Sequence, residues 1–144
     1  MDPIADMFSQ IKNAHGARHE SLTISYSKVK LAILEVLKIR RYIVDYRVVE
    51  KKQNVSDNDN SVKENATKKQ ATLEWKRIEI DLSENAIDIR RVSRPGRRVY
   101  TTSVNIPRPK RPRAMVIIST SKGVLDGEEA RKKGLGGELV AEVR

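Results

Sequence analysis

Three hydroxyl groups, an ammonium group and a glycine follow a continuous run of four apolar residues. The run, Met115 to Ile118, is typical of a strand buried on both faces. The polar residues after it are Ser119, Thr120, Ser121, Lys122 and Gly123. Hydroxyls donate and accept hydrogen bonds, so they can contact ribose 2′-OH groups, phosphates and base edges in irregular RNA, and glycine allows close backbone approach. A turn that merely ends a strand is the equally open alternative, because hydroxyl-rich turns are common.

The same residues form the pattern Ser-x-x-Lys, from Ser119 to Lys122, which is the nucleophile motif of penicillin-binding proteins and β-lactamases. An acyl-transfer enzyme is therefore a remote alternative. The partner motif Lys-Thr-Gly is absent from the sequence, and the N-terminus has no secretory signal. We expect no catalytic residues and no enzymatic reaction.

A stretch without acidic residues lies between Asp88 and Asp126, and its ten cations equal the formal net charge of +10. A charge this localised suggests a polyanionic partner. Arginine outnumbers lysine eight to two in this stretch and makes bidentate phosphate contacts, while no DNA-recognition helix carries the charge, so RNA is favoured over DNA. The ten cations are Arg90, Arg91, Arg94, Arg97, Arg98, Arg108, Lys110, Arg111, Arg113 and Lys122.

The composition argues against several other classes of protein. Without cysteine there are no disulfides, thiolate nucleophiles or Cys-type zinc sites, and His15 and His19 have no evident third ligand. We expect no metal, no cofactor and no small-molecule substrate. No apolar run approaches the roughly 20 residues of a membrane helix. The expectation is a soluble cytoplasmic protein without a membrane partner.

Residues 1–82 carry the pattern of a helix, a strand, a second helix and a hairpin. Asp2 and Pro3 can begin the first helix, and Gly16 can end it. The next strand alternates around Ile24, and Ser27 can cap the second helix. The predicted buried face of that helix consists of Val29, Ile33, Val36 and Leu37.

The hairpin strands are expected over residues 42–48 and 78–82. Residues 51–72 between them are rich in Asn, Asp, Ser and Lys and lack the apolar side chains to fold alone. We predict a mobile insertion there, within an N-terminal α/β half at 1–82.

Residues 83–144 are predicted to form a mainly β half with one short helix, which gives an α+β fold overall. A turn at 83–85 precedes a returning strand that starts at Ile87, and a turn at 93–96 precedes a short strand at 97–101. Three of the five prolines, between positions 107 and 112, favour a stiff surface connection. Asp126 can cap a helix that runs to Lys133, and a last strand alternates around Leu139.

Motifs along the chain resemble the bacterial-type small-subunit ribosomal protein eight family. They comprise the opening helix at residues 2–7 and 11–14, the segment Arg-Val-Ser-Arg-Pro-Gly-Arg-Arg-Val-Tyr at 91–100, the segment Ile-Ser-Thr-Ser-Lys-Gly-Val at 118–124, and Ala-Arg followed by Gly-Leu-Gly-Gly-Glu within 130–138. Together these motifs span the chain from end to end, apart from the insertion and the less distinctive strands around it.

The resemblance implies a two-part α+β protein that binds the central domain of small-subunit rRNA and helps assemble the platform. It also implies contacts with the neighbouring proteins five and twelve, a place in a cytoplasmic or organellar ribosome and, in some members, repression of their own mRNA. A free regulatory RNA-binding protein that represses translation is the alternative function.

Carried over by motif, residues 119–123 would contact RNA, flanked by Arg94 to Tyr100 and Gly136 to Glu138, while the N-terminal half would make a second, phosphate-directed contact. The implied RNA-binding residues are Ser119, Thr120, Ser121, Lys122, Gly123, Arg94, Pro95, Gly96, Arg97, Arg98, Tyr100, Gly136, Gly137, Glu138, Lys12, Asn13, Ser27, Lys28 and Lys30. The sequence departs from the family at Pro112-Arg113-Ala114, where members usually carry Gly-x-Gly, and in the insertion.

Overall fold

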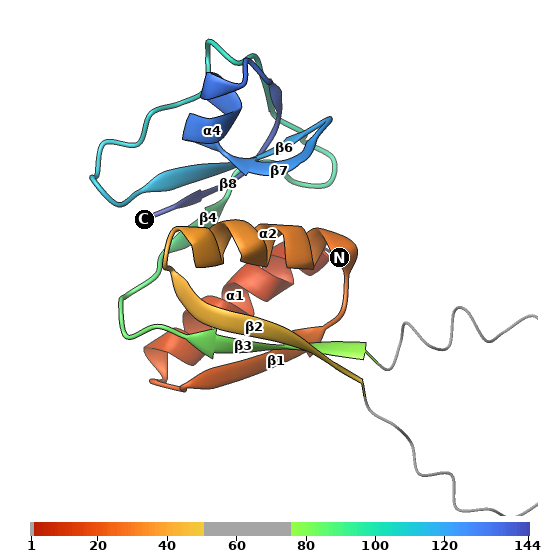
Figure 1. Cartoon of the computed structure of the whole chain (residues 1–144), viewed down its shortest axis with the longest axis vertical. Helices are drawn as coiled ribbons and strands as arrows, with labels where there is room; N and C mark the ends of the chain where they lie inside the picture. Colours follow the sequence, from red (N-terminus) through yellow and green to blue (C-terminus); the bar gives the residue numbers. More distant parts are fainter. Residues whose placement is uncertain (1, 51–75) are drawn as a thin grey trace, which may run out of the picture.

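The computed structural model describes residues 2–50 and 76–144, so the insertion predicted at 51–72 lies outside the described residues. Figure 1 shows two layers of structure stacked along the long axis: a helix-covered sheet from the first part of the chain and a second sheet with one short helix from the remainder. This confirms the predicted α+β class.

The N-terminal part contains α1 (Pro3–Gly16), β1 (Ser21–Ser25), α2 (Lys28–Ile39), β2 (Ile43–Glu50) and β3 (Lys76–Leu82), with antiparallel sheet order β1-β3-β2. The Asp2 side chain accepts a hydrogen bond from the Ile4 amide at 3.1 Å and so caps α1, as predicted. Helical spacing places Met7, Phe8 and Ile11 on one buried face of α1.

One prediction for α2 was wrong. Ile33, Val36 and Leu37 are buried, but Val29 is 49% exposed. Val29 sits in the first turn at the margin of the apolar face, and Leu34 and the aliphatic chain of Lys30 complete the buried face instead. Ser27 occupies the N-cap position without a side-chain capping bond.

The C-terminal part contains β4 (Ile89–Arg91), β5 (Tyr100–Thr101), β6 (Met115–Thr120), β7 (Gly123–Asp126), α4 (Gly127–Lys132) and β8 (Gly137–Val143). The sheet order is β4-β8-β6-β7, and β5 also pairs with β8. Asp126 caps α4 by accepting from the Glu128 amide at 3.3 Å, as predicted.

Strand β6 is buried on both faces, as its apolar run predicts. Met115 and Ile117 pack into a core shared with the N-terminal part, whereas Val116 and Ile118 pack into a smaller cluster with Ala130 of α4. A strand with two buried faces is fixed in register, because a slip of one residue would exchange the two faces.

Three strand predictions need correction. The strand after the 83–85 turn does not return along β3: it crosses over as β4 and pairs with β8. Strand β7, which pairs with β6, was missed. The strand expected at 97–101 shortens to β5, because Arg94 and Arg97 exchange backbone hydrogen bonds at 3.0 Å across the turn.

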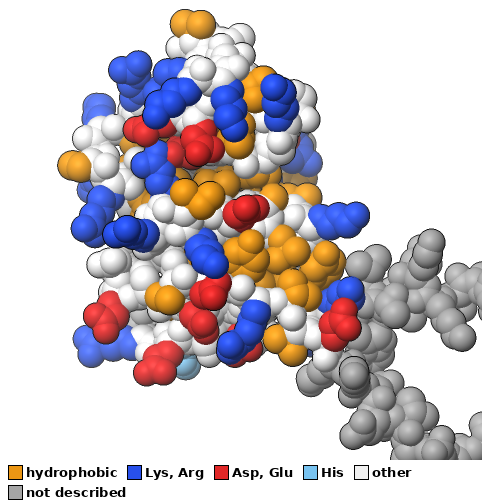
Figure 2. Space-filling model, viewed as in Figure 1, with side chains coloured by type: hydrophobic (Ala, Val, Ile, Leu, Met, Phe, Trp, Pro, Cys, Tyr) orange, Lys and Arg blue, Asp and Glu red, His pale blue; other side chains and the backbone are white. Residues whose placement is uncertain are grey.

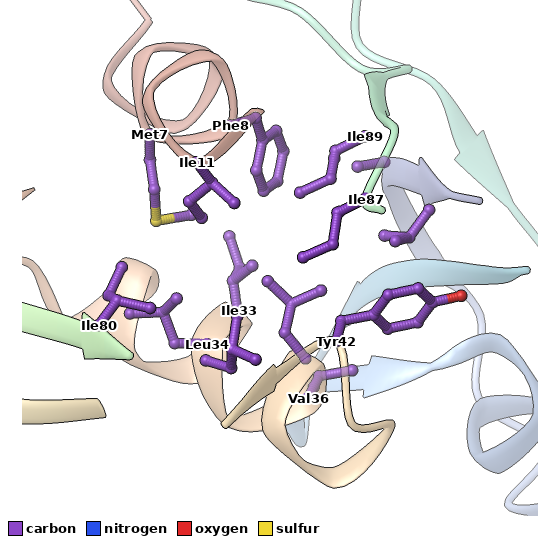
Figure 3. Packing of buried hydrophobic residues seen from close by; sticks show 14 of the residues in the cluster. Met7, Phe8, Ile11, Ile33, Leu34, Val36, Tyr42, Ile80, Ile87 and Ile89 are labelled. Carbon is purple, nitrogen blue, oxygen red and sulfur yellow. The ribbon is translucent and has the colours of Figure 1, made fainter. Parts of the chain in front are cut away.

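One buried cluster joins the two parts. In Figure 3, Phe8 and Ile11 of α1 and Ile33 of α2 face a common interior that Ile87 and Ile89 enter from the segment leading to the second sheet. Polar contacts reinforce the junction: Arg40 at the end of α2 bonds to Asp126 and Glu128, and the guanidinium of Arg91 bonds to Asp2 at 3.1 Å. No helix among the described residues is long and apolar enough to cross a membrane.

Candidate nucleic-acid interface

The hydroxyl turn, residues 119–123, connects β6 to β7 at one end of the five-stranded sheet. Ser119 and Thr120 are the last residues of β6, and Ser121, Lys122 and Gly123 are exposed beyond them. Gly123 has φ of +112°, a left-handed conformation that favours glycine. The rigid, buried body of β6 therefore holds an exposed group of hydroxyls and one ammonium.

The hydroxyl of Thr120 has a different role from that of Ser121. Thr120 Oγ1 donates to the Gly123 carbonyl at 2.8 Å and accepts from the Lys122 amide at 3.2 Å. It therefore closes the turn on itself, which is the local role that threonine hydroxyls often take. Among the described residues, no hydrogen bond engages the Ser121 hydroxyl, so it is available to a ligand.

The same geometry gives no support to the acyl-transfer alternative. In the described part of the chain, no hydrogen bond joins the hydroxyl of Ser119 to the ammonium of Lys122. An activated serine needs a base within hydrogen-bonding reach. The Lys122 backbone is instead bonded to Thr120.

The start of β8 lies beside the hydroxyl turn: Gly137 is its first residue, and Gly136 precedes it. Gly137 stands opposite Thr120 of β6 and Thr101 of β5. A Cβ atom on Gly137 would lie 2.0 Å from the Ser119 carbonyl oxygen, and one on Gly136 would lie 2.6 Å from the Thr101 carbonyl oxygen. Only glycine lets the backbones of β5, β6 and β8 meet at this edge.

Glu138 fixes the loop that precedes β5. Its Oε1 accepts from the buried Ser93 hydroxyl at 2.6 Å and from the Arg98 guanidinium at 2.9 Å. Ser93 Oγ in turn accepts from the Val99 amide at 3.2 Å. The hydrogen bond from Ser93, with Arg98 adding to it, holds the pKa of Glu138 below its usual value despite partial burial. Glu138 is thus an acid inside a basic surface, and its negative charge is already paired with Arg98.

Residues 94–97 form a turn, which we call the Arg94–Arg97 turn, with Pro95 and Gly96 at its tip. All four residues are exposed. Gly96 has φ of +85°, which the turn requires. Among residues 2–50 and 76–144, no side-chain hydrogen bond or ion pair engages Arg94 or Arg97. The side chain of Tyr100 follows on β5, 71% exposed.

The N-terminal residues predicted to contact RNA do not form one group. Asn13 and Lys28 are exposed, whereas Lys12 is paired with Asp88 at 2.9 Å. Lys30 is only 6% exposed, and its ammonium donates to Ser25 Oγ at 2.7 Å, which ties α2 to the end of β1. Ser27 is half-buried at the start of α2.

The basic stretch is also not one surface. Arg91 has a side chain only 8% exposed, bonded to Asp2 and to the Val140 carbonyl, so it stabilises the junction of the two parts. Sequence reasoning missed Ser93, whose side chain organises the loop from a fully buried position. Its only sequence signal is its place before a Pro-Gly turn.

Comparison with known proteins gives consistent matches over nearly the whole chain. The family model described as Ribosomal protein S8 matches residues 2–144. The small ribosomal subunit protein uS8 of Mycoplasmopsis pulmonis is 41% identical, over 97% of this chain and 94% of that protein. The uS8 proteins of Corynebacterium urealyticum and Geobacillus stearothermophilus are each 40% identical, over 99% of this chain and 96% of each relative.

Proposed function

The chain belongs to the ribosomal protein S8 family and is a structural constituent of the small ribosomal subunit, and from this premise we propose that it binds small-subunit rRNA directly through the hydroxyl turn and its neighbours. The proposed target is the central domain of the rRNA, bound early as the platform of the subunit assembles.

One observation carries the proposal. The hydroxyl turn, the glycine-built start of β8 and the Arg94–Arg97 turn come from three distant parts of the sequence and meet at one end of one sheet. Glu138, the acid predicted within this site, is ion-paired with Arg98 and accepts a hydrogen bond from Ser93. The result is a surface that presents the free hydroxyl of Ser121 and unpaired cations on a rigid base.

The two kinds of group have different roles. Arg94, Arg97 and Lys122 attract phosphates of any RNA, which supplies affinity that depends on salt. The Ser121 hydroxyl can discriminate ribose and base edges in an irregular helix, because it both donates and accepts. Exposed Tyr100 adds an aromatic face on which one base can stack.

Further partners follow from the same proposal. Lys28 and Asn13 of the N-terminal part would reach a second phosphate segment, and the neighbouring proteins five and twelve would contact other faces. A messenger RNA that presents a similar irregular helix, including the protein's own, would compete for the hydroxyl turn. Competition between such a messenger and the rRNA fragment tests that extension.

The first experiment measures binding to a central-domain rRNA fragment over a range of salt concentrations. We expect the logarithm of the affinity to fall steeply and linearly with the logarithm of the salt concentration, because released counterions drive phosphate binding. An affinity that does not change with salt would contradict the electrostatic part of the proposal.

The second experiment separates contact from turn geometry. Ser121→Ala should weaken binding to the rRNA fragment by on the order of 1–3 kcal/mol, yet leave binding to an unrelated RNA nearly unchanged. Thr120→Ala should reduce both the affinity and the stability of the turn, because Thr120 bonds within it. Ser21→Ala, at an exposed serine of β1, is the matched control. Equal losses on both RNAs for Ser121→Ala would assign the residue to folding instead.

A further inference from the structure

A second group of cations lies at the opposite end of β6 from the hydroxyl turn. We call residues 107–114 the basic loop: it leads into the first residue of β6, whereas the hydroxyl turn follows the last. The six residues of β6 rise about 3.3 Å each, so roughly 20 Å separates the two ends. In Figure 1 the basic loop lies at the left margin of the upper sheet and the β6–β7 turn at the right.

The basic loop is held in place at both ends. Before it, Ile106 is 4% exposed, and its carbonyl accepts from the Arg131 guanidinium at 3.1 Å. Within it, the Ala114 amide donates to the Arg111 carbonyl at 3.1 Å, and the Tyr42 hydroxyl donates to the Arg113 carbonyl. Three prolines fix further backbone angles. Its cations are therefore partly pre-organised rather than carried on a free strand.

Among the described residues, no acid is ion-paired with the basic loop, and Asp88, which interacts electrostatically with Arg111, is itself paired with Lys12 at 2.9 Å. The acids that line the clefts beside it are Asp126, Glu128 and Glu142. Arg40 is ion-paired with Asp126 and Glu128. The Nε atom of Arg144 lies 3.5 Å from Oε1 of Glu142. In the described residues, the side chains of Arg108, Lys110, Arg111 and Arg113 are exposed and make no hydrogen bond or ion pair. Figure 2 shows how Lys and Arg side chains gather over the upper sheet and its left margin.

From these observations we infer that the basic loop is a second RNA-binding surface, which takes the phosphate backbone of an RNA helix without reading its sequence. Three of its four cations are arginines, which suit bidentate phosphate contacts. A protein partner fits less well, because arginines in protein interfaces lie beside aromatic anchors, which this loop does not contain. The loop offers arginine, lysine, proline and one alanine.

The inference rests on the proposed function only in taking the same rRNA as the ligand, and it adds a length requirement. An RNA bound at the hydroxyl turn must extend roughly 20 Å further to reach the basic loop. Shorter fragments would occupy the hydroxyl turn alone.

The test compares two variants of the full chain with equal net charge. The loop variant carries Arg108→Gln, Lys110→Gln, Arg111→Gln and Arg113→Gln. The control variant carries substitutions at four exposed cations outside both surfaces: Arg18→Gln, Arg77→Gln, Lys132→Gln and Lys133→Gln. Circular dichroism should give the same melting temperature for both. Binding is measured over a range of salt with a long rRNA fragment, with nested truncations of it from each end, and with an unrelated RNA.

The salt slope is the slope of the logarithm of the affinity against the logarithm of the salt concentration. For the loop variant we expect this slope on the long fragment to be about three units less steep, since each lost phosphate contact removes about 0.7–0.9. The control variant should keep a slope close to that of the wild-type chain. The preference for rRNA over unrelated RNA should be unchanged, and wild type and loop variant should bind alike once truncation leaves too few base pairs. Equal slopes for the loop and control variants would overturn the inference while leaving the hydroxyl turn as the binding site.

Two further results separate the alternatives. If the wild-type chain shows no preference for rRNA but the loop variant still loses salt slope, the proposed function fails and the phosphate-binding surface stands. Polyglutamate serves as an acidic polymer without phosphates. If the loop variant loses polyglutamate binding as strongly as RNA binding, the surface accepts any acidic chain, including a protein, and the assignment to RNA is wrong.

Discussion

Both parts of the molecule carry exposed cations, but these cations differ in their partners. In the N-terminal part, Lys38 of α2 pairs with Asp45 of β2 at 2.7 Å, and Arg47 of β2 pairs with Glu79 of β3 at 2.9 Å. On the C-terminal sheet, Arg94, Arg97 and the cations of the basic loop have no such partner within the described residues. The acids near them are already engaged by Arg40, Arg98 and Arg144.

This difference shows that exposure alone does not mark a binding surface. Cations paired across strands contribute to the sheet they lie on, and their charge is largely cancelled at a distance. Cations without partners keep an outward field that attracts polyanions. The contrast to be tested is therefore between cations that are ion-paired and cations that are not.

The largest effect is expected at Gly137, where the C-terminal sheet depends on close contact between the backbones of β6 and β8. Gly137→Ala would place a methyl group 2.0 Å from the Ser119 carbonyl, so β6 and β8 must separate. We expect a loss of roughly 3 kcal/mol in the free energy of unfolding, measured in urea. Gly16→Ala is the control, because nothing lies within 4 Å of a Cβ atom there. Equal stability of the two variants would mean that the strand edge adapts freely.

The next effect concerns the buried acid that links the parts. Asp126→Asn keeps a capping side chain for α4 but removes the charge that accepts from Arg40. We expect a loss of about 2 kcal/mol, less than for a fully buried pair because Arg40 is 37% exposed. Asp45→Asn breaks the exposed pair with Lys38 and should cost much less. Urea unfolding of both variants gives the comparison.

A smaller effect on affinity tests the contrast itself. Arg94→Gln with Arg97→Gln should weaken binding to the rRNA fragment about tenfold and reduce the salt slope by roughly two, because both guanidinium groups are free to contact phosphates. Lys38→Gln with Arg47→Gln removes the same charge from paired positions and should change the slope far less. Equal changes would show that total charge, rather than pairing, controls binding.

Local sequence signals predicted much of this structure. Asp2 and Asp126 cap helices because capping depends on a few neighbouring residues, and β6 has two buried faces because its first four residues are all apolar. The hydroxyl turn was found as a candidate because its residue types stand out after that run. In each case the information lies within a few positions.

Features that depend on distant partners escaped prediction. The strand after residues 83–85 pairs with β8 rather than β3, because β1 and β2 already occupy both edges of β3. The ammonium of the buried Lys30 donates a hydrogen bond to Ser25 Oγ, and the spacing of apolar residues along the helix cannot reveal that bond. Ser93 and Glu138 are 45 positions apart, so their contact, which organises the Arg94–Arg97 turn, has no local signal.

The smallest effect concerns Glu138, where one acid within the basic sheet is held by hydrogen bonds. Because Ser93, and then Arg98, lower the pKa of Glu138 in the folded protein, the folded state binds its proton less readily than the unfolded state. The resulting stabilisation is present above the ordinary value of 4.5 and is lost as the pH falls below it through the folded pKa. Glu138→Gln should therefore flatten the acid side of a stability–pH profile by about 1 kcal/mol. Ser93→Ala should flatten it similarly while also lowering stability at neutral pH, because the Val99 amide loses its acceptor. If both variants keep the wild-type slope, the stabilisation of the Arg94–Arg97 turn does not depend on the charge of Glu138, and the arginines are positioned by the backbone alone.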